Sequence, residues 1–150
     1  MAVEIDTVLV PVDGTDRSER AIAHALPIAD RYGAELHVLH VIDEVVATGL
    51  EQGDIEADSV ANEHRAFMGA VREQVRADGH DVSLSQSTVF GYSASSLSRH
   101  PVNVVLDAAE DIEADFIVIP RQSTMDEPGA MLGKVAEYVL SYASQPVLSV

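Results

Sequence analysis

Five short segments with the pattern of β-strands alternate along the chain with segments of helical periodicity. Thr7–Val12 (TVLVPV) and Leu36–Ile42 (LHVLHVI) are apolar or β-branched runs of strand length, which is typical of buried strands. Phe116–Ile119 and Pro146–Val150 predict two further strands. Val82–Phe90 alternates apolar with more polar side chains, which predicts a strand that is half exposed or at a sheet edge. Strands that alternate with helices indicate a parallel sheet with helices on both faces.

Helical signals fill the intervals between these strands. Asp16 with Glu19 three residues on predicts an N-terminal capping box, and Gly33 predicts the end of that helix. Further helices are predicted at about Ser59–Asp78, from Pro101, and around Val135–Ala143. Residues 43–58 contain six acids, no base and no clean period, so they are predicted to form an acidic loop. No repeat or linker divides the chain, and one domain is predicted over residues 1–150.

The charge of the chain restricts its partners. The 25 acidic residues outnumber the nine basic ones, which gives a net charge of −16 and opposes binding to a nucleic-acid backbone. Two explanations stay open: an ordinary acidic protein, or adaptation to a salt-rich cytoplasm in which counterions screen the repulsion. The chain has no cysteine, which excludes disulfides and thiolate sites. Without a basic signal region or a long apolar run, we expect a cytoplasmic protein with no membrane contact.

Several stretches, in order, resemble the universal stress protein family. They are VLVPVDGTDRSERAIAHALPIADRYGAELHVLHVID near the start, ADFIVIP, and LGKVAEYVLSYASQPVLSV at the end. The resemblance implies a doubly wound α/β fold with a five-stranded parallel sheet in the order 3-2-1-4-5. It also implies a regulatory or ligand-sensing role in the stress response, without dedicated enzyme activity. Family members usually form dimers, which here implicates the last strand. Its residues are Pro146, Val147, Leu148, Ser149 and Val150.

One branch of the family binds ATP, and this chain matches its pattern only in part. The strand-end positions that hold adenosine correspond to Asp13 and Val41, and the phosphate loop has the form G-x-x-G, nine residues, then G-[ST]. That loop falls here on Pro120, Ser123, Gly133 and Lys134, so only one glycine remains. Proline lacks an amide donor, and a Cβ at Ser123 hinders close approach of a phosphate. Asp126 and Glu127 add negative charge to the same segment. We therefore predict a dimeric member that does not bind ATP.

Other interpretations remain at this point. Gly133 and Lys134 are predicted to open the last helix, where amides and a lysine attract an anion, so a monophosphate or ATP stays an alternative ligand. A nucleotide switch or weak hydrolase would use the nucleotide-binding candidates. These candidates are Pro11, Asp13, Val41, Ser123, Gly133 and Lys134. A third interpretation is an accessory subunit whose acidic loop and serine-rich segment 91–100 contact another protein.

Two competing motifs fail on their spacing. GAMLGK, at Gly129–Lys134, has one residue too few between its glycines for a phosphate-binding P-loop, and valine follows the lysine. His37 and His40 lie three apart in a predicted strand, so they point to opposite faces and do not form a metal pair. Asp13 has a structural alternative to ligand binding, which is to accept hydrogen bonds from nearby amides after the strand. No catalytic residues and no metal ligands are predicted.

Overall fold

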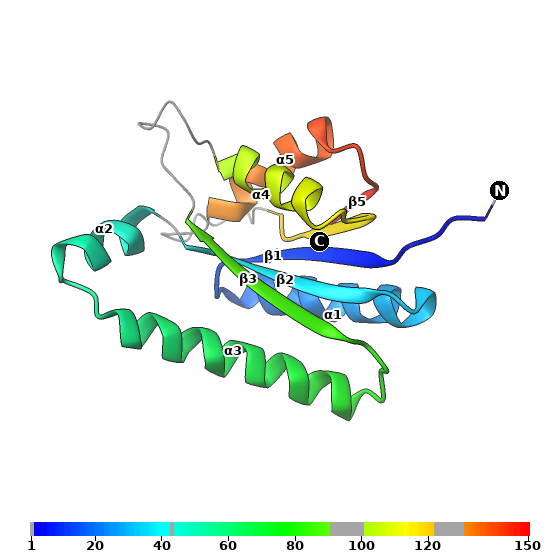
Figure 1. Ribbon diagram of the computed structural model, residues 1–150, viewed down its shortest axis with the longest axis horizontal. Coiled ribbons are helices and arrows are strands. Elements are labelled where there is room, and N and C mark those ends of the chain that lie inside the picture. Colours follow the sequence, from blue (N-terminus) through cyan, green and yellow to red (C-terminus); the bar gives the residue numbers. More distant parts are fainter. Residues whose placement is uncertain (1, 43, 91–100, 122–130) are drawn as a thin grey trace.

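The computed structural model describes residues 2–42, 44–90, 101–121 and 131–150. Its five strands form one parallel sheet in the order β3-β2-β1-β4-β5 (Figure 1). This confirms the predicted fold class and strand order. The strands are β1 (Thr7–Val12), β2 (Glu35–Ile42), β3 (Leu84–Phe90), β4 (Phe116–Ile119) and β5 (Val147–Ser149).

Helices cover both faces of the sheet, as the alternating pattern predicts. In Figure 1, α1 and α3 lie below the sheet, and α4 and α5 lie above it. The helices are α1 (Asp16–Tyr32), α2 (Glu44–Gln52), α3 (Ala57–Ala77), α4 (Pro101–Asp111) and α5 (Met131–Tyr142). Among the described residues, no helix combines the length and apolar character that crossing a membrane requires.

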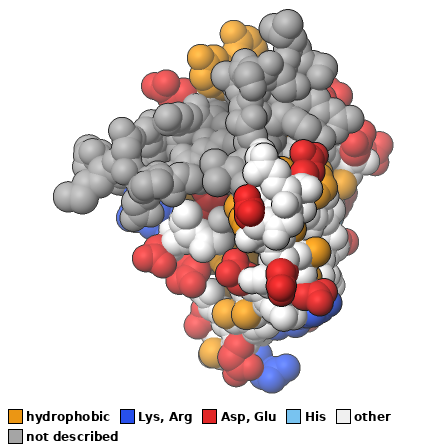
Figure 2. Space-filling view, turned by 90° about the vertical axis from the view of Figure 1, so that its left-hand side faces the viewer, with side chains coloured by type: hydrophobic (Ala, Val, Ile, Leu, Met, Phe, Trp, Pro, Cys, Tyr) orange, Lys and Arg blue, Asp and Glu red, His pale blue; other side chains and the backbone are white. Residues whose placement is uncertain are grey.

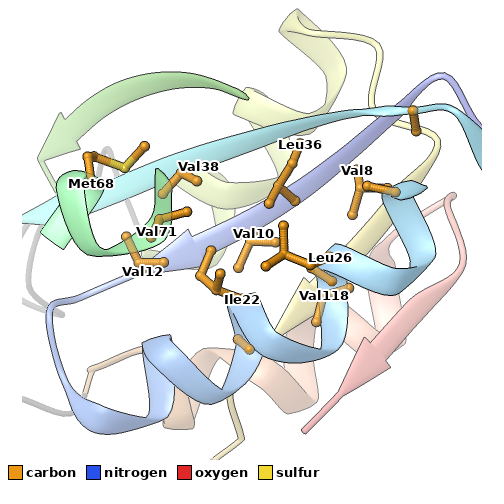
Figure 3. Close-up of a cluster of buried hydrophobic side chains, with 14 of the residues drawn as sticks. Val8, Val10, Val12, Ile22, Leu26, Leu36, Val38, Met68, Val71 and Val118 are labelled. Carbon is orange, nitrogen blue, oxygen red and sulfur yellow. The ribbon is translucent and has the colours of Figure 1, made fainter. Parts of the chain in front are cut away.

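The sheet separates two apolar cores because its side chains alternate between its faces. On one face, Val8, Val10 and Val12 of β1 pack with Ile22 and Leu26 of α1 (Figure 3). On the other, Leu9, Leu39 and Ile117 pack with helices α4 and α5. All these side chains are fully buried. The burial of β1 on both faces fixes the position of its carboxyl end, where Asp13 follows.

Two local predictions are wrong. Residues 43–58 are not all loop, because α2 occupies Glu44–Gln52 and turns Gly49 into the core. This helix is short, and its acids hide the weak apolar period that Val46 and Gly49 create. Asp16 is also not a helix cap. Thr15 holds the N-cap position of α1 without a side-chain cap bond, and Asp16 is the first helical residue.

Other boundaries agree with the sequence signals. Gly33 ends α1 in the left-handed conformation, with φ +64° and its N–H bonded to the Asp30 carbonyl. Pro101 begins α4, where a missing amide proton costs no helical bond. The prediction for β3 is confirmed, because it pairs only with β2 among the described strands and several of its side chains are exposed. The serine-rich segment 91–100 lies outside the described residues.

Candidate functional site

A pocket of about 600 Å³ opens where β1 and β2 end. Ligands of open parallel sheets bind at this end of the strands. Helices α2 and α3 supply its outer wall, and Figure 2 views the molecule from this side. The lining residues are Val12, Asp13, Gly14, His40, Val41, Ile42, Val46, Ile55, Ser59, Val60, Glu63, His64, Ala66 and Phe67. The volume falls within the range of pockets that hold small molecules.

Asp13 organises the turn from β1 into α1. Its Oδ1 accepts hydrogen bonds from the Thr15 amide at 3.1 Å, the Thr15 hydroxyl at 2.6 Å and the Ser18 hydroxyl at 2.9 Å. The Asp13 amide lies 2.9 Å from the same Ser18 oxygen. The intervening Gly14 has φ +82°, a conformation that glycine adopts without strain. The structural role considered for Asp13 is therefore present, and none of these bonds uses Oδ2.

Two histidines stack in the wall of the pocket. The rings of His40 on β2 and His64 on α3 are parallel within 5°, and their centroids are 4.3 Å apart. Nε2 of His64 also lies 2.9 Å from Oε1 of Gln86 on β3, whereas its buried Nδ1 has no hydrogen-bond partner among the described residues. Burial and, to a smaller extent, His64 lower the pKa of His40 to about 4, while Asp13 opposes the shift. His40 is therefore neutral near pH 7.

The stacked pair does not provide a metal site in this arrangement. An imidazole binds a metal in the plane of its ring, and two parallel stacked planes share no such point. No group of three His, Cys, Asp or Glu side chains in the described part of the chain could hold a metal ion.

His37 faces the opposite side of the sheet from His40, as the strand period predicts. Its Nδ1 lies 2.7 Å from the Ser85 hydroxyl and its Nε2 lies 2.8 Å from the Ser87 hydroxyl. Burial lowers the pKa of His37, while the charge of Glu35 acts in the opposite direction. Both partners are side chains of β3.

Comparison with known proteins agrees with this arrangement. The model of the universal stress protein family matches residues 4–150, nearly the whole chain. The chain belongs to the universal stress protein family. A universal stress protein of Thermus aquaticus is 31% identical over 144 residues, covering 96% of this chain and 97% of the relative. One from Methanocaldococcus jannaschii is 28% identical over 144 residues, covering 95% of this chain and 80% of the relative.

Solved universal stress protein structures share the fold. One from Lactobacillus plantarum has a TM-score of 0.70 at 22% identity, and the match covers 99% of each chain. A universal stress protein in complex with cAMP has a TM-score of 0.67 at 22% identity, covering 99% of this chain and 98% of the other. The universal stress protein from Archaeoglobus fulgidus in complex with dAMP has a TM-score of 0.62 at 18% identity. The match covers 99% of this chain and 98% of the other.

The nucleotide-binding candidates from the sequence occupy different places in this universal stress protein fold. Asp13 and Val41 line the pocket together, whereas Pro11 is buried in β1 and is not among the lining residues. Gly133 and Lys134 lie within the first turn of α5, which begins at Met131, two residues earlier than predicted. Ser123 lies outside the described residues.

Pro120 follows β4 directly and is buried. The carbonyl of Ile119 and the amide of Arg121 both bond to Val150, so the main chain of Pro120 points away from β5. On the side away from β5, the imide nitrogen of Pro120 therefore stands where any other residue would present an N–H. A ligand approaching there meets no backbone donor from residue 120.

The predicted dimer segment forms the edge of the sheet opposite β3. Val147–Ser149 makes β5, which pairs with β4, and Pro146 and Val150 flank it. The main chain of Pro146 and Val150 bonds to β4, so by alternation Val147 and Ser149 direct theirs outward. Val147 also packs against the core beneath α4 and α5.

The α2–α3 side of the pocket is not among the residues predicted from the sequence. Its members include Val46 on α2, Ile55 just after that helix, and Ser59 and His64 on α3. A constant spacing of four at Ser59, Glu63 and Phe67 places these residues on one face of α3 and is a usable signal. The stacking of His64 on His40 depends on tertiary packing, which the sequence alone does not reveal.

Proposed function

We propose that this universal stress protein is a ligand-sensing regulator that does not bind ATP. The observation that carries the proposal is Pro120 at the first glycine position of the phosphate loop. A buried proline there removes a backbone donor on the side turned away from β5. Ser123 and Lys134 replace two further loop residues of the ATP-binding pattern.

A nucleoside monophosphate is a second candidate ligand. The pocket beside Asp13 and Val41 supports it, because about 600 Å³ is ample for a nucleoside and one phosphate. Two proteins of similar fold carry cAMP or dAMP, each with a single phosphate. Lys134 in the first turn of α5 would supply a positive charge for that phosphate.

We further propose that the protein acts as a homodimer in a salt-rich cytoplasm, with no enzymatic role of its own. The outward main chain of Val147 and Ser149 on β5 supports strand pairing across a two-fold axis. Figure 2 shows acidic side chains scattered over the described part of this side of the molecule, with few basic ones among them. With a net charge of −16, such a protein benefits from counterions. An accessory role that involves another protein is the remaining alternative.

Calorimetric titration tests the ligand proposal. ATP, ADP and AMP are titrated with magnesium into the protein in high KCl, and ATP is expected to give no saturable heat. Saturable AMP binding that weakens in Lys134→Ala would establish the monophosphate candidate. Saturable ATP binding would overturn the main proposal. Phosphate release measured in the same solutions checks for hydrolysis, of which none is expected.

A further inference from the structure

Within the part of the chain that the structure describes, β3 presents main-chain groups along one edge of the sheet that no other strand pairs with. The Leu36 amide donates to the Ser83 carbonyl, and the register continues unbroken from Leu36–Leu84 to Ile42–Phe90. Odd-numbered β3 residues therefore direct their N–H and C=O groups toward β2. The even-numbered residues direct theirs outward. These residues are Leu84, Gln86, Thr88 and Phe90.

This edge lacks the devices that usually prevent strand pairing. Leu84–Phe90 (LSQSTVF) contains no charged residue and no proline, and its continuous register leaves no bulge. Gln86, Ser87 and Thr88 are exposed, and Phe90 is 44% exposed. In Figure 1, β3 lies at the front of the sheet, with α3 beneath it rather than across its edge. A seven-residue edge of this kind is available to another strand.

Side-chain contacts on both faces hold β3 in place. His37 bridges the hydroxyls of Ser85 and Ser87 on one face, at 2.7 and 2.8 Å. On the other face, His64 contacts the Gln86 side chain at 2.9 Å. These contacts order the strand before any partner arrives, which lowers the entropic cost of pairing.

A second copy is repelled less at the β3 edge than at the rest of the molecular surface. The chain carries −16, so two copies repel each other in general. The helix beside this edge is neutral, because α3 holds the acids Asp58, Glu63 and Glu73 and the bases Arg65, Arg72 and Arg76. An uncharged strand beside a neutral helix gives two copies a surface with little mutual repulsion.

We propose that β3 pairs antiparallel with β3 of a second copy across a two-fold axis at Ser87. This register places Leu84 opposite Phe90 and Gln86 opposite Thr88, so outward main-chain groups meet in hydrogen-bonded pairs. It also brings the exposed Phe90 against Leu84 of the second copy, and no like charges face each other along the strand. This interface is separate from the β5 pairing proposed above, and the two together would join dimers into larger assemblies.

Sedimentation over a concentration series in high KCl tests the interface. Thr88→Pro removes an outward N–H and leaves the β2 ladder intact, and Thr88→Ala is the matched control that keeps the N–H. Ser149→Pro and Ser149→Ala form the corresponding pair on β5. Thr88→Lys, which blunts an edge by charge, serves as a second β3 variant if the proline variant fails to fold, as judged by circular dichroism.

Thr88→Pro is expected to reduce the limiting mass of the wild-type assembly to that of a dimer, while Thr88→Ala retains the wild-type mass. In the Ser149→Pro background, the remaining dimer should become a monomer when Thr88→Pro is added. If Ser149→Pro changes nothing but Thr88→Pro gives monomers, β3 pairing holds and the β5 proposal fails. A folded Thr88→Pro or Thr88→Lys variant with the wild-type mass at every concentration would overturn β3 pairing, whatever the result at β5.

Discussion

Asp13 combines a structural and a candidate ligand role in one carboxylate. Asp13→Ala removes the acceptor of three hydrogen bonds at the start of α1, and partly buried donors lose their partner. The free energy of unfolding should fall by about 1–3 kcal/mol. Asp13→Asn keeps a side-chain oxygen and should cost less. Urea unfolding of both variants measures the difference, and equal losses would show that the Oδ1 bonds contribute little.

The lowered pKa of His40 predicts that the folded chain loses stability in weak acid. Burial lowers the pKa of His40 to about 4 in the folded chain, from an unfolded value near 6.5. The unfolded chain therefore binds the proton more readily, and stability falls as the pH drops from about 6.5 toward 4. In His40→Phe the decline over this window should be shallower, whereas His24→Phe, on the exposed side of α1, should match the wild type. Unfolding curves at several pH values compare the three, and identical slopes would contradict the assignment.

At the scale of the element, α2 and the segment after it form one wall of the pocket. A Cβ added at Gly49 would lie 2.5 Å from Cδ1 and 2.7 Å from Cγ1 of Ile55, so Gly49→Ala forces Ile55 to move. Overpacking of this kind costs about 1–3 kcal/mol. In an Ile55→Ala background the two closest atoms are gone and only the Cβ of residue 55, at 3.3 Å, stays near, so the cost should shrink toward zero or become a gain in α2 stability of up to about 1 kcal/mol. A double-mutant cycle measured by denaturation tests this, and additive effects would refute the contact.

The sequence predicts those elements whose pattern is set by burial or by backbone chemistry. Thr7–Val12 and Phe116–Ile119 are found at their observed bounds because strands buried on both faces are continuously apolar. Gly33 and Pro101 mark helix ends through their own backbone restrictions. The helix at Glu44–Gln52 is missed because its short apolar period is masked by acids. The shared location of Asp13 and Val41 can be predicted from the sheet topology, because both lie where neighbouring parallel strands end. The His40–His64 stack depends on how α3 packs against the sheet.

At the scale of the whole molecule, the charge of −16 predicts strong stabilisation by salt. Raising KCl from about 0.1 M to about 1 M shortens the Debye length from about 10 to about 3 Å and screens the repulsion between acids. The melting temperature should rise steeply. Replacing the exposed Glu51, Asp54 and Glu56 by lysine adds two charges at each site, which changes −16 to −10. This variant should respond less to KCl, and an equal response would point to a general salt effect.

Titration of ATP into two proteins tests the central claim most directly. One is the wild type, and the other carries P120G, S123G and K134S, which restore the family's phosphate-loop pattern while Gly133 is retained. Calorimetry in high KCl with magnesium should show no saturable heat for the wild type and clear binding for the restored variant. That result would assign the loss of ATP binding to the loop. Wild-type binding of ATP as tight as that of the restored variant would contradict the account.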